Sequence, residues 1–286
     1  MSTTSDPGSR ATRLTSFTHA GLTFDVTDAG PLDGNVVVLL HGFPQKATSW
    51  AGVIGLLNTA GYRTVALDQR GYSPGARPRV RRAYRLRELT GDVVALIDRL
   101  GVGPVHLIGH DWGANVGWSV AGHHPDLVRT WTAVSVPHPA AFSRALRSLD
   151  QARRSWYMAF FQLPRLPEAV LSRTGEGEPR LLADAGMDAA ALGRYRHEMV
   201  EGGALPGALG WYRALPFLTS VPRVTVPTTF VWSSGDSAVS RRAADLCAGY
   251  ATGLYRFVEV AGTHWIPDQQ PSAISDAFLA GVARAG

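Results

Sequence analysis

An aspartate occupies a position in this sequence from which it could act as a nucleophile. Asp111 is the central residue of Gly109-His110-Asp111-Trp112-Gly113, between an apolar run and a helical pattern. Two glycines at this spacing allow a sharp turn that projects the central side chain from the carboxyl edge of a sheet. The pentapeptide alone also suits an ordinary turn in which Asp111 caps the following helix, so its context has to decide.

Two later residues could complete a catalytic triad with Asp111. Asp236 follows the run TTFVWSSG, and His264 lies in Gly-Thr-His-Trp just after the run YRFVEVA. Each follows the carboxyl end of an expected parallel strand, which is where such sheets place their ligands. We therefore predict a triad of Asp111, Asp236 and His264. We interpret five other histidines, which have no comparable arrangement, as surface or packing residues: His110, His123, His124, His138 and His197.

The loop after the first buried run could supply an oxyanion hole. His41-Gly42-Phe43-Pro44 directly follows VVVLL. In this arrangement one backbone N–H comes from that loop and the second from the residue after the nucleophile. The predicted donors are the N–H groups of Phe43 and Trp112. In isolation, the same tetrapeptide also reads as a Gly-Pro turn that ends a strand.

Strands and helices alternate along most of the chain. After an expected hairpin over residues 17–30, apolar runs predict strands and longer patterns predict helices. The expected strands cover residues 36–41, 62–68, 104–110, 128–136, 228–234 and 255–262; the expected helices cover 49–58, 87–100, 113–123, 241–248 and 271–285. Such alternation predicts an α/β protein whose mostly parallel sheet is covered by helices on both faces.

The alternation stops between residues 139 and 222. This stretch has no convincing buried strand, only helical patterns interrupted by Pro and Gly. We predict a helical cap at 139–222, inserted into a core domain made of residues 14–138 and 223–286. Residues 1–13 are polar and rich in Ser and Thr, and we predict a disordered tail there.

Composition narrows the class of protein. The 286 residues are 45% hydrophobic and 18% charged, as in ordinary globular proteins, and the single cysteine, Cys247, cannot form an internal disulfide. The chain shows neither a secretory signal nor a span long enough for a bilayer, so we expect a cytoplasmic protein without a membrane partner. The net charge of +5 comes largely from arginines, densest at residues 77–87. These would scatter around a helix, so we expect a solvated surface and no nucleic acid.

Four motifs together carry a family resemblance. GHDWGA (109–114), HGFP (41–44), DQRGYS (68–73) and GTHW (262–265) resemble those of the epoxide hydrolase and haloalkane dehalogenase branch of the α/β-hydrolase superfamily. The resemblance covers nearly the whole chain after the tail. It implies an eight-stranded core, a helical cap over the site, no cofactor and no metal, and two-step chemistry through an enzyme ester.

The nucleophile limits the reaction. A carboxylate that attacks an ester would form a labile anhydride, whereas at an sp³ carbon bearing oxygen or halogen it forms a stable alkyl ester. Water activated by His264 can then attack that ester at the Asp111 carbonyl carbon. Serine-esterase activity is disfavoured.

The expected cap favours an epoxide over a halide. An epoxide opens to an alkoxide that needs a proton, and the resemblance places the two cap tyrosines that donate it at Tyr157 and Tyr212. Either tyrosine could alternatively be a packing residue. Haloalkane dehalogenation is the alternative function, although such enzymes usually carry Asn where this chain has Phe43.

Aromatic residues around the expected site suggest the substrate class. We predict that a lipophilic epoxide and water are the reactants, and that the protein is a monomer or homodimer. The predicted substrate-binding residues are Phe43, Trp112, Trp156 and Phe161.

Overall fold

The computed structural model describes residues 12–173 and 180–286. Most of the predicted tail, residues 1–13, therefore lies outside the described residues. The described chain begins with the expected hairpin, formed by β1 (Ser16–His19) and β2 (Leu22–Ala29), which pair antiparallel.

A single sheet of eight strands organises the fold. Its order is β1-β2-β4-β3-β5-β6-β7-β8. The hairpin joins the sheet through an antiparallel β2–β4 pair, and all the remaining pairs are parallel. The predicted fold class, a mostly parallel eight-stranded α/β-hydrolase sheet, is confirmed. The six other strands are β3 (Val36–Leu40), β4 (Arg63–Leu67), β5 (Val105–His110), β6 (Val128–Val134), β7 (Thr228–Ser233) and β8 (Tyr255–Val260).

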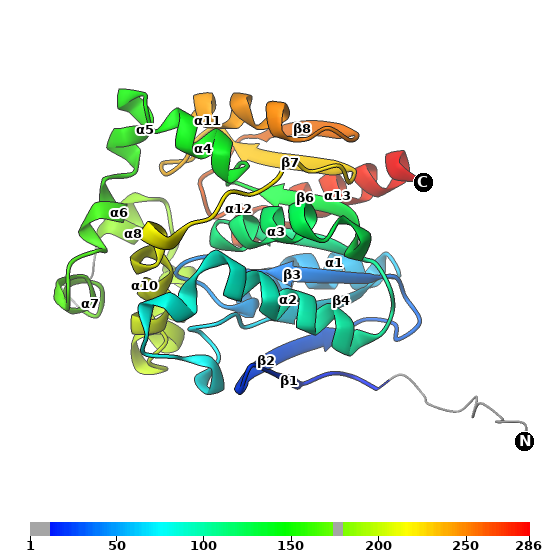
Figure 1. Cartoon of the computed structure of the whole chain (residues 1–286), viewed down its shortest axis with the longest axis horizontal. Coiled ribbons are helices and arrows are strands. Elements are labelled where there is room, and N and C mark those ends of the chain that lie inside the picture. The colour runs from blue at the N-terminus through cyan, green and yellow to red at the C-terminus, as the bar shows by residue number, and fades with distance from the viewer. Residues whose placement is uncertain (1–11, 174–179) are drawn as a thin grey trace, which may run out of the picture.

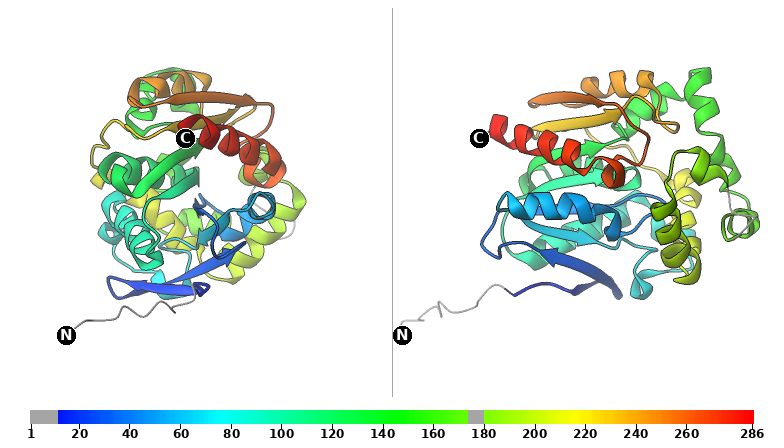
Figure 2. Two further views of the ribbon diagram at one scale, coloured as in Figure 1. Left: turned by 90° about the vertical axis from the view of Figure 1, so that its right-hand side faces the viewer. Right: turned by 180° about the vertical axis from the view of Figure 1, so that it is seen from behind.

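Helices cover both faces of this sheet because its central strands are apolar on both sides. In β3, Val38 and Leu40 pack on one face, whereas Val37 and Leu39 pack on the other. The first face carries α2 (Leu86–Leu100) and α3 (Trp112–His123), and the second carries α1 (Ala51–Thr59) and α13 (Pro271–Ala285). The right view of Figure 2, from behind, shows α1 (blue) and α13 (red) in front of the sheet.

In its described residues, the segment between β6 and β7 forms short helices and no strand. Most of them gather beyond the carboxyl ends of the parallel strands (Figure 1). The first, α4, instead packs against α11 (Arg241–Leu246), which follows β7. The helices of this segment are α4 (Pro139–Ala145), α5 (Leu149–Arg154), α6 (Trp156–Phe160), α7 (Leu166–Leu171), α8 (Arg180–Asp184), α9 (Ala189–Tyr195) and α10 (Leu205–Arg213); α12 (Ile266–Gln269) precedes α13.

The arginine-rich stretch is mostly irregular. Residues 77–87 contain one short 3₁₀ turn, Arg81–Tyr84, and end in the first residues of α2; another 3₁₀ turn, Pro74–Ala76, directly precedes the stretch. Arg77 donates to the Gly202 carbonyl and Arg81 to the Arg213 carbonyl, so part of this charge joins the sheet domain to the helical segment. In the part of the chain that the structure describes, none of the helices combines the length and apolar character needed to cross a bilayer.

Candidate active site

Asp111 lies at the turn between β5 and α3. Its backbone has φ 51° and ψ −117°, a strained conformation for a residue with a side chain. Although Asp111 immediately precedes α3, its side chain accepts no capping hydrogen bond from that helix. The turn is also tightly packed, because a Cβ on Gly113 would lie 2.1 Å from the Leu40 carbonyl oxygen. The strained turn thus projects the carboxylate instead of using it as a helix cap.

The carboxylate of Asp111 is bound by the loop after β3. The Phe43 backbone N–H donates to Asp111 Oδ1 over 2.7 Å. Gly42 allows this approach, since a Cβ there would lie 2.4 Å from Asp111 Cβ. The Trp112 N–H, at the first residue of α3, stays a prediction as the second donor. The two carboxylate oxygens therefore differ: Oδ1 lies on a backbone donor, and Oδ2 faces His264.

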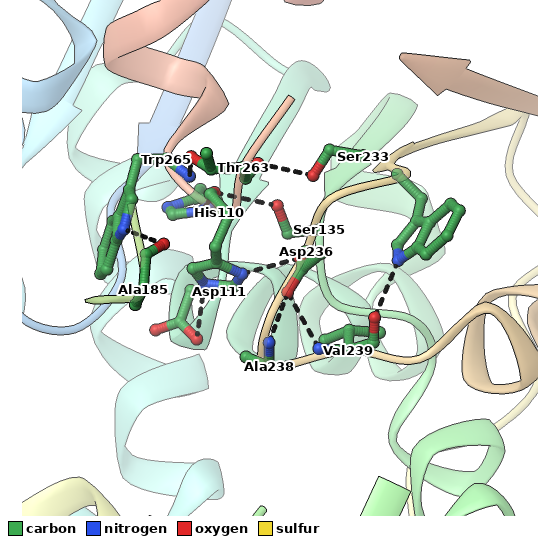
Figure 3. A network of polar contacts seen from close by, with 12 residues as sticks. His110, Asp111, Ser135, Ala185, Ser233, Asp236, Ala238, Val239, Thr263 and Trp265 are labelled. Carbon is green, nitrogen blue, oxygen red and sulfur yellow. Dashed lines mark hydrogen bonds and ion pairs between the residues drawn. The ribbon is translucent and has the colours of Figure 1, made fainter. Parts of the chain in front are cut away.

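His264 bridges the two predicted carboxylates. Its Nε2 lies 3.5 Å from Asp111 Oδ2, and its Nδ1 lies 2.8 Å from Asp236 Oδ2. The other Asp236 oxygen accepts hydrogen bonds from the N–H groups of Ala238 and Val239, over 2.8 and 2.9 Å. Asp111, Asp236 and His264 follow the ends of β5, β7 and β8, and Figure 3 shows the polar contacts around Asp111 and Asp236. The structure thus brings together three residues that lie 28 to 153 positions apart in the sequence.

Burial and charge oppose one another in this triad. Burial raises the pKa of Asp111, but the hydrogen bond and positive charge of His264 outweigh it and hold that pKa below its usual range. Burial likewise lowers the pKa of His264, yet the carboxylates of Asp236 and Asp111 raise it to about 10. At neutral pH the site therefore holds an imidazolium between two carboxylates.

Tyr157 in α6 and Tyr212 in α10 lie next to each other and line the same cavities as Asp111. Their ring centroids are 5.9 Å apart, with the rings nearly perpendicular. Burial, reinforced by the negative charge of Asp111, raises the pKa of both phenols above the usual value. Both therefore carry their protons at neutral pH and can donate hydrogen bonds.

Two cavities meet at these residues. The first has a volume of about 230 Å³ and the second about 270 Å³. Four residues line both cavities: Asp111, Tyr157, Tyr212 and Ala238. Asp111 and the two tyrosines thus lie where the two cavities meet.

The predicted substrate-binding residues divide between the cavities. Phe43, Trp156 and Phe161 line the first cavity, and Trp112 lines the second. Phe43 and Phe161 are buried, with ring centroids 5.3 Å apart, whereas Trp156 is 56% exposed and lies at the edge of its cavity. All four side chains therefore line the cavities beside Asp111, although much of Trp156 is exposed to solvent.

Sequence analysis missed the part that His110 plays in this site. His110 is completely buried, and its Nε2 donates to the His264 carbonyl oxygen over 2.9 Å. The two rings lie 4.8 Å apart, and burial together with the charge of His264 lowers the pKa of His110 to about 3. A neutral His110 thus holds the backbone of His264. Its position beside Asp111 in the turn was the available signal.

Comparisons with known proteins identify the family of this chain. Residues 35–271 match the family described as the alpha/beta hydrolase fold. The chain is 35% identical over 270 residues to the AB hydrolase superfamily protein YfhM of Bacillus subtilis, covering 91% of this chain and 94% of that protein. It is 31% identical over 309 residues to epoxide hydrolase A of Mycobacterium tuberculosis, again covering 91% and 94%.

A solved structure of an epoxide hydrolase is also similar to this chain. The crystal structure of Bacillus megaterium epoxide hydrolase in complex with an inhibitor superposes with a TM-score of 0.84 at 25% identity, covering 94% of this chain and 99% of that one. The fold and these comparisons define an α/β-hydrolase, in which Asp111 lies at the turn between β5 and α3. Within that superfamily, the chain belongs to the epoxide hydrolase family.

Proposed function

We propose that this protein converts a lipophilic epoxide to a vicinal diol through a covalent ester on Asp111. The observation that carries the proposal is the carboxylate itself, held with Oδ1 on the Phe43 N–H and Oδ2 facing His264. Oδ2 attacks a ring carbon, the carbon–oxygen bond of the ring breaks, and a tyrosine protonates the departing oxygen. Water then attacks the ester carbonyl carbon, and the diol leaves with Oδ2.

The loss of the negative charge on Asp111 during alkylation prepares His264 for ester hydrolysis. When Asp111 becomes an ester it loses its negative charge, and with it one of the two carboxylates that raise the pKa of His264. The pKa of His264 then falls, so the proton it held becomes available to replace the one that a tyrosine donated. The neutral imidazole, still oriented by Asp236, can take a proton from water.

The loss of the Asp111 charge also lowers the pKa values of the two tyrosines. The charge of Asp111 contributes to the raised pKa values of Tyr157 and Tyr212. As that charge is consumed in the new bond, both phenols become better acids at the moment when the ring oxygen becomes basic. An alkyl halide, whose leaving group needs no proton, would make no use of this coupling.

The two cavities support a lipophilic substrate. Apart from the catalytic residues, aromatic and aliphatic side chains predominate in both linings, including Phe161 in the first and Phe142 in the second. Each cavity is larger than a cavity of about 150 Å³, which accommodates benzene. Either one can therefore hold an aromatic or branched substituent while the epoxide lies at Asp111.

The division into cap and core, the cellular location, the oligomeric state and the partners also belong to the proposal. A cap at 139–222 on a core of residues 14–138 and 223–286 is supported by the helices α5 to α10, which lie beyond the strand ends. The packing of α4 against α11 means that the first helix of this cap rests on the core. We further propose cytoplasmic action as a monomer or homodimer, without nucleic acid or membrane partners and without a cofactor.

Trapping the ester tests the proposal. His264→Gln should still be alkylated by an epoxide such as styrene oxide, but it should not release the diol. Intact-mass spectrometry should show the protein heavier by one substrate, with the modification on Asp111. An adduct on another residue, or normal turnover without His264, would contradict the proposal. Incubation with haloalkanes should release no halide.

A further inference from the structure

The catalytic acid depends on the conformation of a short loop. We call residues 234–240, between β7 and α11, the acid loop. Asp236 uses one carboxylate oxygen for His264 and the other for two N–H groups of the loop itself, those of Ala238 and Val239. Any shift of the peptide groups at 238 and 239 must therefore reorient the carboxylate that faces His264.

Gln151 in α5 binds this loop on both sides of Val239. Its Nε2 donates to the Ala238 carbonyl oxygen over 2.8 Å, and its Oε1 accepts from the Ser240 N–H over 2.8 Å. The second amide hydrogen goes to Ser155 Oγ over 3.0 Å. The side chain is completely buried, so these bonds have no competition from water. A buried amide with its polar atoms all paired fixes the position of its partners.

Arg154, one turn further along α5, binds the same loop at its other end. Its Nη1 donates to the Asp236 carbonyl oxygen over 2.6 Å, while its Nε pairs with Asp150. Residues three apart lie on the same face of a helix. One face of α5 therefore holds peptide groups at residues 236, 238 and 240.

We propose that Gln151 and Arg154 are positioning residues through which α5 sets the orientation of the catalytic acid Asp236. This inference rests on the proposed function, because it assigns them to one of its two steps. Ester hydrolysis needs His264 oriented by Asp236. Alkylation needs the carboxylate of Asp111 and the tyrosines, neither of which is held by the acid loop.

Gln151→Leu tests this assignment, since leucine keeps much of the side-chain volume but makes no hydrogen bond. The two steps are measured separately with styrene oxide by rapid quench and intact-mass spectrometry. We expect ester hydrolysis to slow by about 10²-fold, the effect of misplacing a catalytic group by about 1 Å, and the alkyl-enzyme to accumulate. The alkylation rate should change little. Arg154→Gln should act in the same direction but less, because water reaches its side chain.

Two further variants complete the test. Arg153→Gln, on the neighbouring exposed position of α5, should match the wild type in both steps. Gln151→Glu should hydrolyse the ester poorly while its carboxyl is ionised, because a carboxylate would face the Ala238 carbonyl. As the pH falls and this buried carboxyl is protonated, it can donate to that carbonyl again, and the rate relative to the wild type should recover. Gln151→Leu should show no such recovery.

The outcomes are distinct. If Gln151→Leu loses alkylation and hydrolysis equally, together with thermal stability, Gln151 is a merely structural residue and the inference is overturned. An unchanged hydrolysis rate in this variant would also overturn it. Failure of the proposed function appears elsewhere, as the absence of any adduct on Asp111 in the His264→Gln variant.

Discussion

Replacing Gly42 with alanine should slow alkylation of the enzyme strongly. An added Cβ would lie 2.4 Å from Asp111 Cβ and 2.6 Å from Asp111 Oδ1, whereas ordinary contacts begin at 3.4 Å. The nucleophile and the loop after β3 must then move apart by about 1 Å. A displacement of that size costs about 10²-fold in rate, or roughly 2.7 kcal/mol in the barrier. The crowding itself should cost roughly 1–3 kcal/mol of folding stability.

The assay mixes excess enzyme with styrene oxide and follows the alkyl-enzyme by mass, with circular dichroism and thermal unfolding to verify the fold. Gly55→Ala is the matched control. Gly55 is exposed in α1, and its added Cβ would meet nothing within 4 Å. It should react as the wild type does and gain about 0.5–1 kcal/mol of stability. Wild-type alkylation by a folded Gly42→Ala variant would refute the assigned position of the nucleophile.

Three other predictions concern protons and buried charge. Replacing both Tyr157 and Tyr212 with phenylalanine should reduce alkylation by an epoxide by about 10²–10⁴-fold and leave ester hydrolysis unchanged; single-turnover rates separate the two. Because the folded state raises the pKa of His264 from its ordinary value near 6.5 to about 10, the imidazolium stabilises the fold fully below pH 6.5 and progressively less up to pH 10. Urea unfolding should show this decline in the wild type and its loss in His264→Gln. Arg70 donates from Nε and Nη2 to the buried carboxylate of Asp92 over 2.8 and 2.7 Å. Arg70→Met should cost about 3–5 kcal/mol of folding stability by removing the guanidinium from this carboxylate, and adding Asp92→Leu should recover most of it.

Periodicity and strand-end positions predicted much of this molecule. The buried runs became strands within one or two residues of their predicted limits because continuous apolar segments can only lie between two layers of helices. The helix predicted at 87–100 occupies Leu86–Leu100. The predicted triad residues meet because parallel strands bring their carboxyl ends to one edge of the sheet.

Other features depend on contacts that no local pattern encodes. The arginine-rich stretch was expected to be a solvated surface segment, but Arg77 and Arg81 donate to carbonyl groups more than a hundred residues away. His110 looked like a packing residue because its partner is a backbone carbonyl at His264. The position of Gln151 carried no signal either, since its role arises from α5 packing on the acid loop.

The hydrogen bond from Phe43 to Asp111 should keep the two carboxylate oxygens of Asp111 distinct from one turnover to the next. In the proposed mechanism, the oxygen that accepts from the Phe43 N–H is not the one that attacks, and water replaces only the oxygen that leaves with the diol. In water enriched in oxygen-18, the first diol should carry an unlabelled enzyme oxygen and later diols a heavy one. After many turnovers the Asp111 carboxylate should hold a single heavy atom. A second heavy atom would appear only as fast as the carboxylate breaks its bond to Phe43 and rotates, so isotope incorporation measures how firmly this loop holds the nucleophile.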